Sequence, residues 1–403
     1  MELFWLEHKK LWRKKIVKIC VLLCFVYYVI FGSILSFQWF SFGSSDDYTS
    51  AFGNNFDGYT VIKDSQEYAL SFGGELTDET LQQIVSDYQQ MEADGMEEEL
   101  EKTDWQIVNS WLGTLYPELR DTSNYKTMIS YVDPDKLTGF YERRQQVLDE
   151  FLEVSGQVGA EKEYLHQIDG KVEKPFHYEW VEGWSTLLGS MVADLGVVMA
   201  LFLGIVLSSL FAGEWHDNTS TLVLTTRNGW GKIALAKILT GLAFTVELFA
   251  LLAVSNVISQ LFFMGTAGWD MPIQNIKLIA VAPMNMLQAE IYEYAFVLLG
   301  AIGFAGIVMF ISAAVKNNVL TLLLSLAVVY GPMMIAEYLP YGMQKALDLI
   351  PLVGSSTDIF RTNTFRIFGK LIWSPYLIII IPVLIGILCM PFAIKSWSRR
   401  MKA

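Results

Sequence analysis

The chain has 403 residues, of which 53% are hydrophobic and 18% charged, and its formal net charge at pH 7 is −13. So much apolar sequence combined with so much charge requires the two kinds of residue to lie in separate segments. This pattern is typical of a membrane protein with polar domains outside the bilayer. The acidic balance argues against nucleic acid as a partner, because binding to a phosphate backbone requires clustered basic residues.

Six apolar stretches are long enough to cross a bilayer, since about 18 or more apolar residues predict a transmembrane helix. They are 16–36, 185–212, 233–264, 291–315, 316–336 and 373–394. We therefore predict an α-helical polytopic membrane protein with six transmembrane helices. The first stretch is expected to be a signal anchor, because no small-residue cleavage pattern follows it.

Segment 1–15 mixes bases with large apolar residues, which predicts an interfacial elbow helix, although a plain basic flank of the anchor fits the same residues. The apolar residues in question are Leu3, Trp5, Leu6 and Trp12. Further bases lie in loop 213–232 and in tail 395–403. Because Lys and Arg favour the cytosolic side, we predict a multi-pass plasma-membrane protein with both termini cytosolic.

Segment 37–184 is predicted to form one large extracellular domain. It has 30 acidic and 10 basic residues, a net charge of −20, whereas the rest of the chain is net +7. It holds no cysteine, which leaves no disulfide framework and no cysteine metal site there. Its acidic surface is either a solvated face or one that attracts a cationic peptide or ion.

Helical periodicity predicts that this domain is mainly helical, either α or α+β. Thr77 precedes Asp78 and Glu79 and is a candidate helix N-cap. Apolar residues then follow at helical spacing: Leu81, Ile84, Val85 and Tyr88.

Two other segments are expected on the same side. Residues 265–290 form a predicted extracellular loop, and residues 337–372 form predicted extracellular or re-entrant helices. Glu290 and Glu293 border a span and are expected to be interfacial or hydrated. Small residues inside that span predict close helix packing: Gly300, Gly303 and Gly306.

Polar residues inside spans are costly unless they are paired or hydrated. Glu247 lies near the middle of its apolar run, Asp194 lies in the outer part of the preceding one, and Asn256 lies beyond Glu247. All three are candidates for a translocation path. The alternative for each is a hydrogen bond to a neighbouring helix.

Patterns that would indicate catalysis or nucleotide binding are missing from the sequence. The four histidines form no His-x-x-x-His or Glu-x-x-His pattern, and no Gly-x-Ser-x-Gly occurs. The run Gly229–Ile233 has the Gly-Lys of a phosphate-binding loop but lacks its first glycine and its Ser/Thr. We therefore expect no catalytic residue, metal or cofactor in this chain.

Loop 213–232 is longer than a turn between two membrane helices requires, and it is rich in threonine and basic at its far end. It resembles the coupling segment of ABC-2 type (type V) ABC transporter permeases of Gram-positive exporters, in which Glu, Thr, Arg and Lys follow the second span in this order. It departs from many members at Asn218–Ser220 and Thr226. The resemblance assigns ATPase coupling to five residues: Glu214, Thr219, Arg227, Lys232 and Lys237.

The resemblance implies that the chain is the permease subunit of an ATP-driven exporter in the lipid bilayer. ATP and Mg²⁺ would be bound by a separate ABC ATP-binding subunit, and a second permease subunit would complete a homo- or heterodimer. A peptide or lipid-like substrate ranks ahead of an ion. The alternative is a membrane receptor or immunity module whose extracellular domain binds a peptide without transport.

Overall fold

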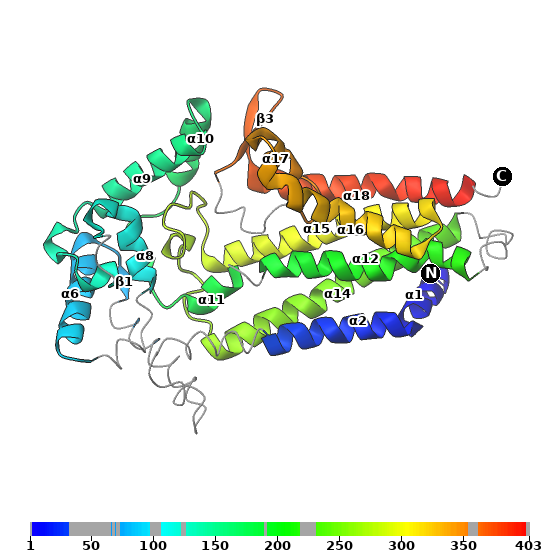
Figure 1. Ribbon diagram of the computed structural model, residues 1–403, viewed down its shortest axis with the longest axis horizontal. Helices are drawn as coiled ribbons and strands as arrows, with labels where there is room; N and C mark the ends of the chain where they lie inside the picture. Colours follow the sequence, from blue (N-terminus) through cyan, green and yellow to red (C-terminus); the bar gives the residue numbers. More distant parts are fainter. Residues whose placement is uncertain are drawn as a thin grey trace, which may run out of the picture.

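The computed structural model describes residues 2–31, 66, 69, 73–96, 106–121, 126–188, 192–217, 231–353 and 362–399. Five of its helices are long and apolar enough to span a membrane. They are α12 (Val192–His216), α14 (Lys232–Met264), α15 (Met286–Val315), α16 (Asn318–Ile335) and α18 (Ser374–Arg399). They run along a common direction and form an elongated bundle (Figure 1). The expected α-helical membrane character is therefore confirmed.

The first predicted span, 16–36, lies partly outside the described residues. Its first half forms α2 (Lys15–Val26), which continues as a π-helical turn, η1 (Tyr27–Phe31). A sixth span therefore stays a prediction. Preceding it, α1 (Glu2–Arg13) is a separate helix, as the elbow prediction requires. Its Trp5 and Leu6 are exposed, with 61% and 64% of their surface accessible.

The core of the bundle lies between α12, α14 and α15. Its fully buried side chains include Leu203, Leu207, Phe244, Phe304 and Val308. Helix α18 packs closely along α15, because Gly303 and Gly306 of α15 face the backbone of Pro382 and Gly386 in α18. The predicted role of these two glycines in close packing is thus confirmed.

The two ends of the bundle differ in what they carry. Helix α1, the end of α12, the start of α14 and the end of α18 lie at one end (Figure 1). A separate domain that contains α6 (Asp78–Ala93), α8 (Gln106–Leu115) and α9 (Phe140–Val154) lies at the other end. The described parts of the segments predicted to be cytosolic thus lie at the end opposite the acidic domain.

The acidic domain is helical, as predicted, with one very short sheet. Its remaining elements are α10 (Ala160–Asp169), α11 (Glu182–Thr186), the 3-10 turns η2 (Pro117–Leu119), η3 (Met128–Ser130) and η4 (Pro134–Lys136), and the antiparallel strands β1 (Gly74–Glu75) and β2 (His177–Tyr178). The predicted N-cap is confirmed, because Thr77 Oγ1 accepts a hydrogen bond from Thr80 N at 3.2 Å. The predicted face of α6 belongs to the same buried cluster as Trp111 and Leu112 of α8, and α6 itself packs against η3 and η4.

Residues 337–372, predicted to be helical, hold both helix and strand. They include part of η7 (Ala336–Tyr338), then α17 (Tyr341–Leu347) and an antiparallel hairpin of β3 (Thr364–Ile367) and β4 (Lys370–Trp373). The two-residue turn has φ of 49° at Phe368 and 80° at Gly369. Positive φ at both positions is the geometry that suits a tight hairpin, with glycine supplying the second residue at no steric cost. The connection between α14 and α15, residues 265–285, contains one 3-10 turn, η6 (Ile273–Asn275).

Candidate functional site

Four charged residues meet where α1 packs against the ends of α12 and α14. Lys237 Nζ of α14 donates to Glu214 Oε1 of α12 at 2.8 Å and to Glu7 Oε2 of α1 at 2.7 Å. Lys10 Nζ of α1 donates to the same oxygen of Glu214 at 2.6 Å. We call Glu7, Lys10, Glu214 and Lys237 the α1 cluster. It joins α1 to two helices whose contacting residues lie 204 and 230 positions further along the chain.

The α1 cluster is electrically balanced and has a buried centre, whereas Lys10 at its edge is 51% exposed. The side chains of Glu214 and Lys237 are 4% and 2% exposed. Burial lowers the pKa of Lys10, but the hydrogen bond and charge of Glu214 raise it by more, so the pKa lies above its usual value. Neighbouring Lys14, which donates to Ser209 Oγ at 2.9 Å, has its pKa lowered by burial and by the charges of Lys237 and Lys10. Two acids thus neutralise two bases, and additional positive charge is disfavoured.

Glu247, a candidate for the translocation path, makes a second attachment of α1 to α14. Its carboxylate oxygens lie 3.2 Å from His8 Nε2 and 3.0 Å from Trp12 Nε1. The Trp12 ring also packs against Phe244, with 5.7 Å between ring centroids. The geometry therefore brings Glu247 together with α1, apart from Asn256, and its side chain is 43% exposed.

The five coupling candidates are only partly described. Glu214 and Lys237 are brought together in the α1 cluster, and Lys232 is the exposed first residue of α14. Thr219 and Arg227 lie outside the described residues. The loop that contains them connects α12 to α14, the two helices that the Glu214–Lys237 pair joins.

A second polar group lies in the half of the bundle nearest the acidic domain. Asn256 Nδ2 of α14 donates to the Tyr294 hydroxyl of α15 at 3.0 Å. Glu290 and Glu293 lie on α15 beside Tyr294 and are 4% and 0% exposed. We call Asn256, Glu290, Glu293 and Tyr294 the carboxyl cluster. The expectation that the two glutamates are hydrated is wrong, because both are buried, whereas their position at the membrane interface stays a prediction.

Asp194 lies near this group but at its edge. It is exposed at the start of α12, within electrostatic range of the buried Tyr28, which itself lies within range of Tyr294. Two of the three translocation-path candidates, Asp194 and Asn256, are therefore in one region of the bundle. The sequence analysis did not assign Glu293 to a polar cluster. A signal was available, because Glu293 lies three residues after Glu290, a spacing that places both side chains on one helix face.

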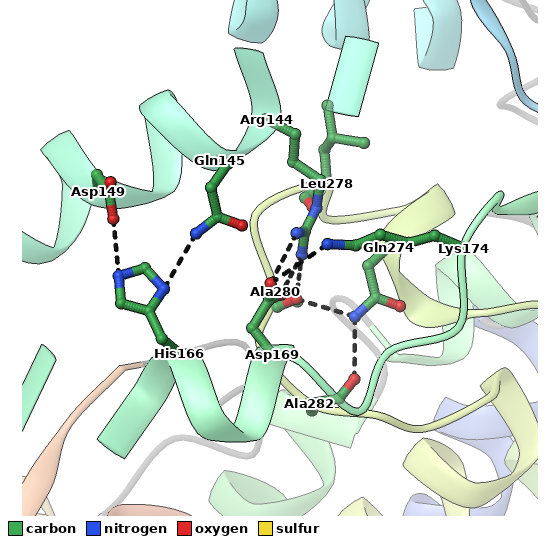
Figure 2. A network of polar contacts seen from close by, with 10 residues as sticks. All are labelled: Arg144, Gln145, Asp149, His166, Asp169, Lys174, Gln274, Leu278, Ala280 and Ala282. Carbon is green, nitrogen blue, oxygen red and sulfur yellow. Dashed lines mark hydrogen bonds and ion pairs between the residues drawn. The ribbon is translucent and has the colours of Figure 1, made fainter. Parts of the chain in front are cut away.

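The acidic domain is fastened to the bundle by a buried arginine. Arg144 of α9 donates to both carboxylate oxygens of Asp169 at 2.6 and 3.1 Å (Figure 2). It also donates to the backbone oxygens of Leu278 at 2.7 Å and Ala280 at 3.1 Å in the 265–285 connection. Gln274 Nε2 completes the network with 2.9 Å bonds to the Ala280 and Ala282 oxygens.

No protein-family model, curated protein or solved structure matches this chain. The family resemblance drawn from loop 213–232 is accordingly carried forward as a proposal.

Proposed function

We propose that the chain is the permease subunit of an ATP-driven exporter, coupled to a separate ATPase through the loop between α12 and α14. The observation that best supports this proposal is the α1 cluster. Glu214 and Lys237 pair the two helices that flank the loop, and both residues bind α1. A force applied to the loop would therefore reach α12, α14 and α1 together.

The burial of Glu214 changes the role proposed for it. A carboxylate that is 4% exposed and bonded to two lysines is poorly placed to bind a base of the ATPase. We therefore infer that Glu214 and Lys237 transmit movement inside the permease. We assign direct contact with the ATPase to exposed Lys232 and to Thr219 and Arg227 of the loop.

The test is ATP hydrolysis by the permease–ATPase complex, purified through a tag on this chain and reconstituted in lipid. Lys10→Ala removes the direct ion pair between α1 and α12 but leaves the Glu214–Lys237 pair intact, so we expect the variant to fold. Arg227→Ala removes the proposed contact with the ATPase. We expect each variant to lower substrate-stimulated hydrolysis by about fivefold or more, the scale of an ordinary coupling energy.

Lys9→Ala is the matched control, because it removes an exposed base from the same helix outside the α1 cluster. Its hydrolysis should equal that of the unmodified complex. Unchanged stimulation in both Lys10→Ala and Arg227→Ala would contradict coupling through these elements.

A peptide receptor without transport is the second candidate, and a pocket on the acidic domain favours it. The pocket lies between residues 171–177 and the connection 270–288, and its lining includes Glu173, His177 and Asp270. The receptor proposal predicts that no ATPase co-purifies with the tagged chain at a fixed ratio. Stable ATPase association with stimulated hydrolysis would reject it.

A further inference from the structure

We infer that the carboxyl cluster is a binding site for a compact monovalent cation. The site is independent of the proposed function, since a cation can bind there whether or not the chain transports anything. If the chain is a permease, the same cluster is a point at which a positively charged substrate or a coupling ion is held between α14 and α15.

The backbone brings the members of the cluster together. Glu290, Glu293 and Tyr294 are separated by three and four residues on α15, a spacing that places side chains on one helix face. Asn256 reaches this face from α14, since its Nδ2 bonds to the Tyr294 hydroxyl at 3.0 Å. Asn256 and Glu290 thus both lie beside the Tyr294 hydroxyl, and Glu293 lies within electrostatic range of Glu290.

These groups have unused acceptor atoms. Both carboxyl oxygens of Glu290, both of Glu293 and Oδ1 of Asn256 are buried without a hydrogen-bond partner among the described residues. The Tyr294 hydroxyl is the nearest donor to Glu290 and interacts with its carboxyl group, but no bond within the usual distance and angle limits joins them. Among the described residues no Lys, Arg or His forms an ion pair with either glutamate. An unpaired buried carboxylate is strongly disfavoured, so each of these groups is neutralised either by a proton or by a bound cation.

The chemistry of the unpartnered atoms indicates which kind of cation the cluster can bind. All five are oxygens, the donors preferred by hard cations, whereas softer transition metals favour nitrogen and sulfur. The described residues hold no group of three or more His, Cys, Asp or Glu that would form a metal cage. One carboxylate, with the second carboxyl group protonated and neutral oxygens beside it, balances the charge of a compact monovalent cation. Its source is either an alkali-metal ion or the ammonium group of an organic molecule.

The experiment measures thermal unfolding of the purified full-length protein in lipid nanodiscs. The reference buffer contains the chloride salt of N-methyl-D-glucamine, whose cation is bulky. Sodium chloride, potassium chloride or ethylammonium chloride then replaces this salt at constant ionic strength, so that only the cation changes. We expect at least one compact cation to raise Tm by about 3 °C or more, because a ligand stabilises the state that binds it. A rise with sodium or potassium alone identifies a metal-ion site, and a rise with ethylammonium identifies an amine site.

Glu293→Gln and Asn256→Ala test the location, since each removes oxygen donors from the cluster. Only the cation-dependent rise in Tm is compared, because Glu293→Gln also alters basal stability by removing a buried acid. Both variants should lose the rise. Glu247→Gln is the matched control, as it neutralises a half-exposed carboxylate of α14 that binds α1, and it should keep the rise.

Three results would overturn the inference: no rise with any compact cation, a full rise in Asn256→Ala, or a full rise in Glu293→Gln. Should Glu293→Gln fail to fold, Asn256→Ala decides the outcome. The readout involves no ATPase, so a negative result leaves the proposed coupling standing. Conversely, unstimulated hydrolysis in the coupling experiment leaves the cation site standing.

Discussion

At the scale of single residues, Arg144 has the most demanding environment of the acidic domain. Its side chain is fully buried, and its guanidinium bonds to Asp169 and to two backbone oxygens of the 265–285 connection. The planar fork of arginine matches the two oxygens of a carboxylate, a geometry that the single ammonium of lysine cannot reproduce. The same side chain therefore stabilises the domain and fixes it to the bundle.

Arg144→Met is expected to destabilise the acidic domain by about 3–5 kcal/mol, because it leaves the carboxylate of Asp169 buried with only Lys174 nearby. Lys126→Met breaks an exposed ion pair with Glu92 in the same domain and should cost at most about 1 kcal/mol. Urea unfolding followed by tryptophan fluorescence compares the two variants, since buried Trp111 bonds to Asn275 of the same connection. Equal losses in both would contradict the role given to Arg144.

Residue positions in the site were only partly predictable. Asn256 was identified because polar side chains inside spans are costly, and it does belong to a polar cluster. Glu293 was misplaced, because its position at the start of an apolar run is equally compatible with hydration and with burial. Which of the two occurs depends on how α14 and α15 pack. Likewise, Lys10, one of the two lysines that bind Glu214, comes from α1, and a sequence separation of 204 residues hides such a pair.

At the scale of elements, the contact of α15 with α18 depends on residues without side chains. A Cβ added at Gly306 would overlap the backbone of Gly386, and one added at Gly303 would overlap that of Pro382. Helix association in a membrane relies on close van der Waals packing, since lipid supplies no hydrophobic driving force between helices. These glycines therefore set the distance between the two helices.

Gly306→Ala should force α15 and α18 apart and cost about 1–3 kcal/mol, the usual price of overpacking. Gly331→Ala is the matched control, because an added Cβ at Gly331 meets nothing within 4 Å. This control should be neutral or slightly stabilising, as alanine favours helix over glycine. The melting temperatures of the detergent-solubilised variants provide the measurement. A Gly306→Ala protein as stable as the control would show that the two helices need no such approach.

Apolar runs located the long helices well but not their ends. The run 233–264 nearly coincides with α14, whereas α15 begins five residues before the run 291–315. Its start is set by a capping box of Asn285 and Gln288, polar residues that hydropathy does not register. The β3–β4 hairpin was missed for a similar reason, because its signal is a glycine turn between short alternating segments.

At the scale of the whole molecule, the acidic domain is attached to the bundle at several separate points. Besides Arg144, Trp180 Nε1 donates to the backbone oxygen of Met264 at the end of α14 at 3.2 Å. Thr364 of the hairpin donates to Gln157 Oε1 at 3.0 Å. The domain is thus joined to the end of α14, to the hairpin that precedes α18 and to the connection before α15. Movement of these helices would be passed to the domain.

The separation of charge along the molecule leads to a prediction of topology. The acidic domain lies at one end and the basic α1 at the other, and basic residues are retained on the cytosolic side of a membrane. In a background without Cys20, Cys24 and Cys389, a cysteine introduced at exposed Asp94 should react with a membrane-impermeant thiol reagent added to intact cells. A cysteine at His216, whose side chain is 76% exposed at the opposite end, should react only after the membrane is permeabilised. Permeabilisation also supplies the control, because both positions must then be labelled. If intact cells label the cysteine at position 216 but not the one at position 94, the orientation is the reverse of the predicted one. Loop 213–232 would then lie on the side without ATP.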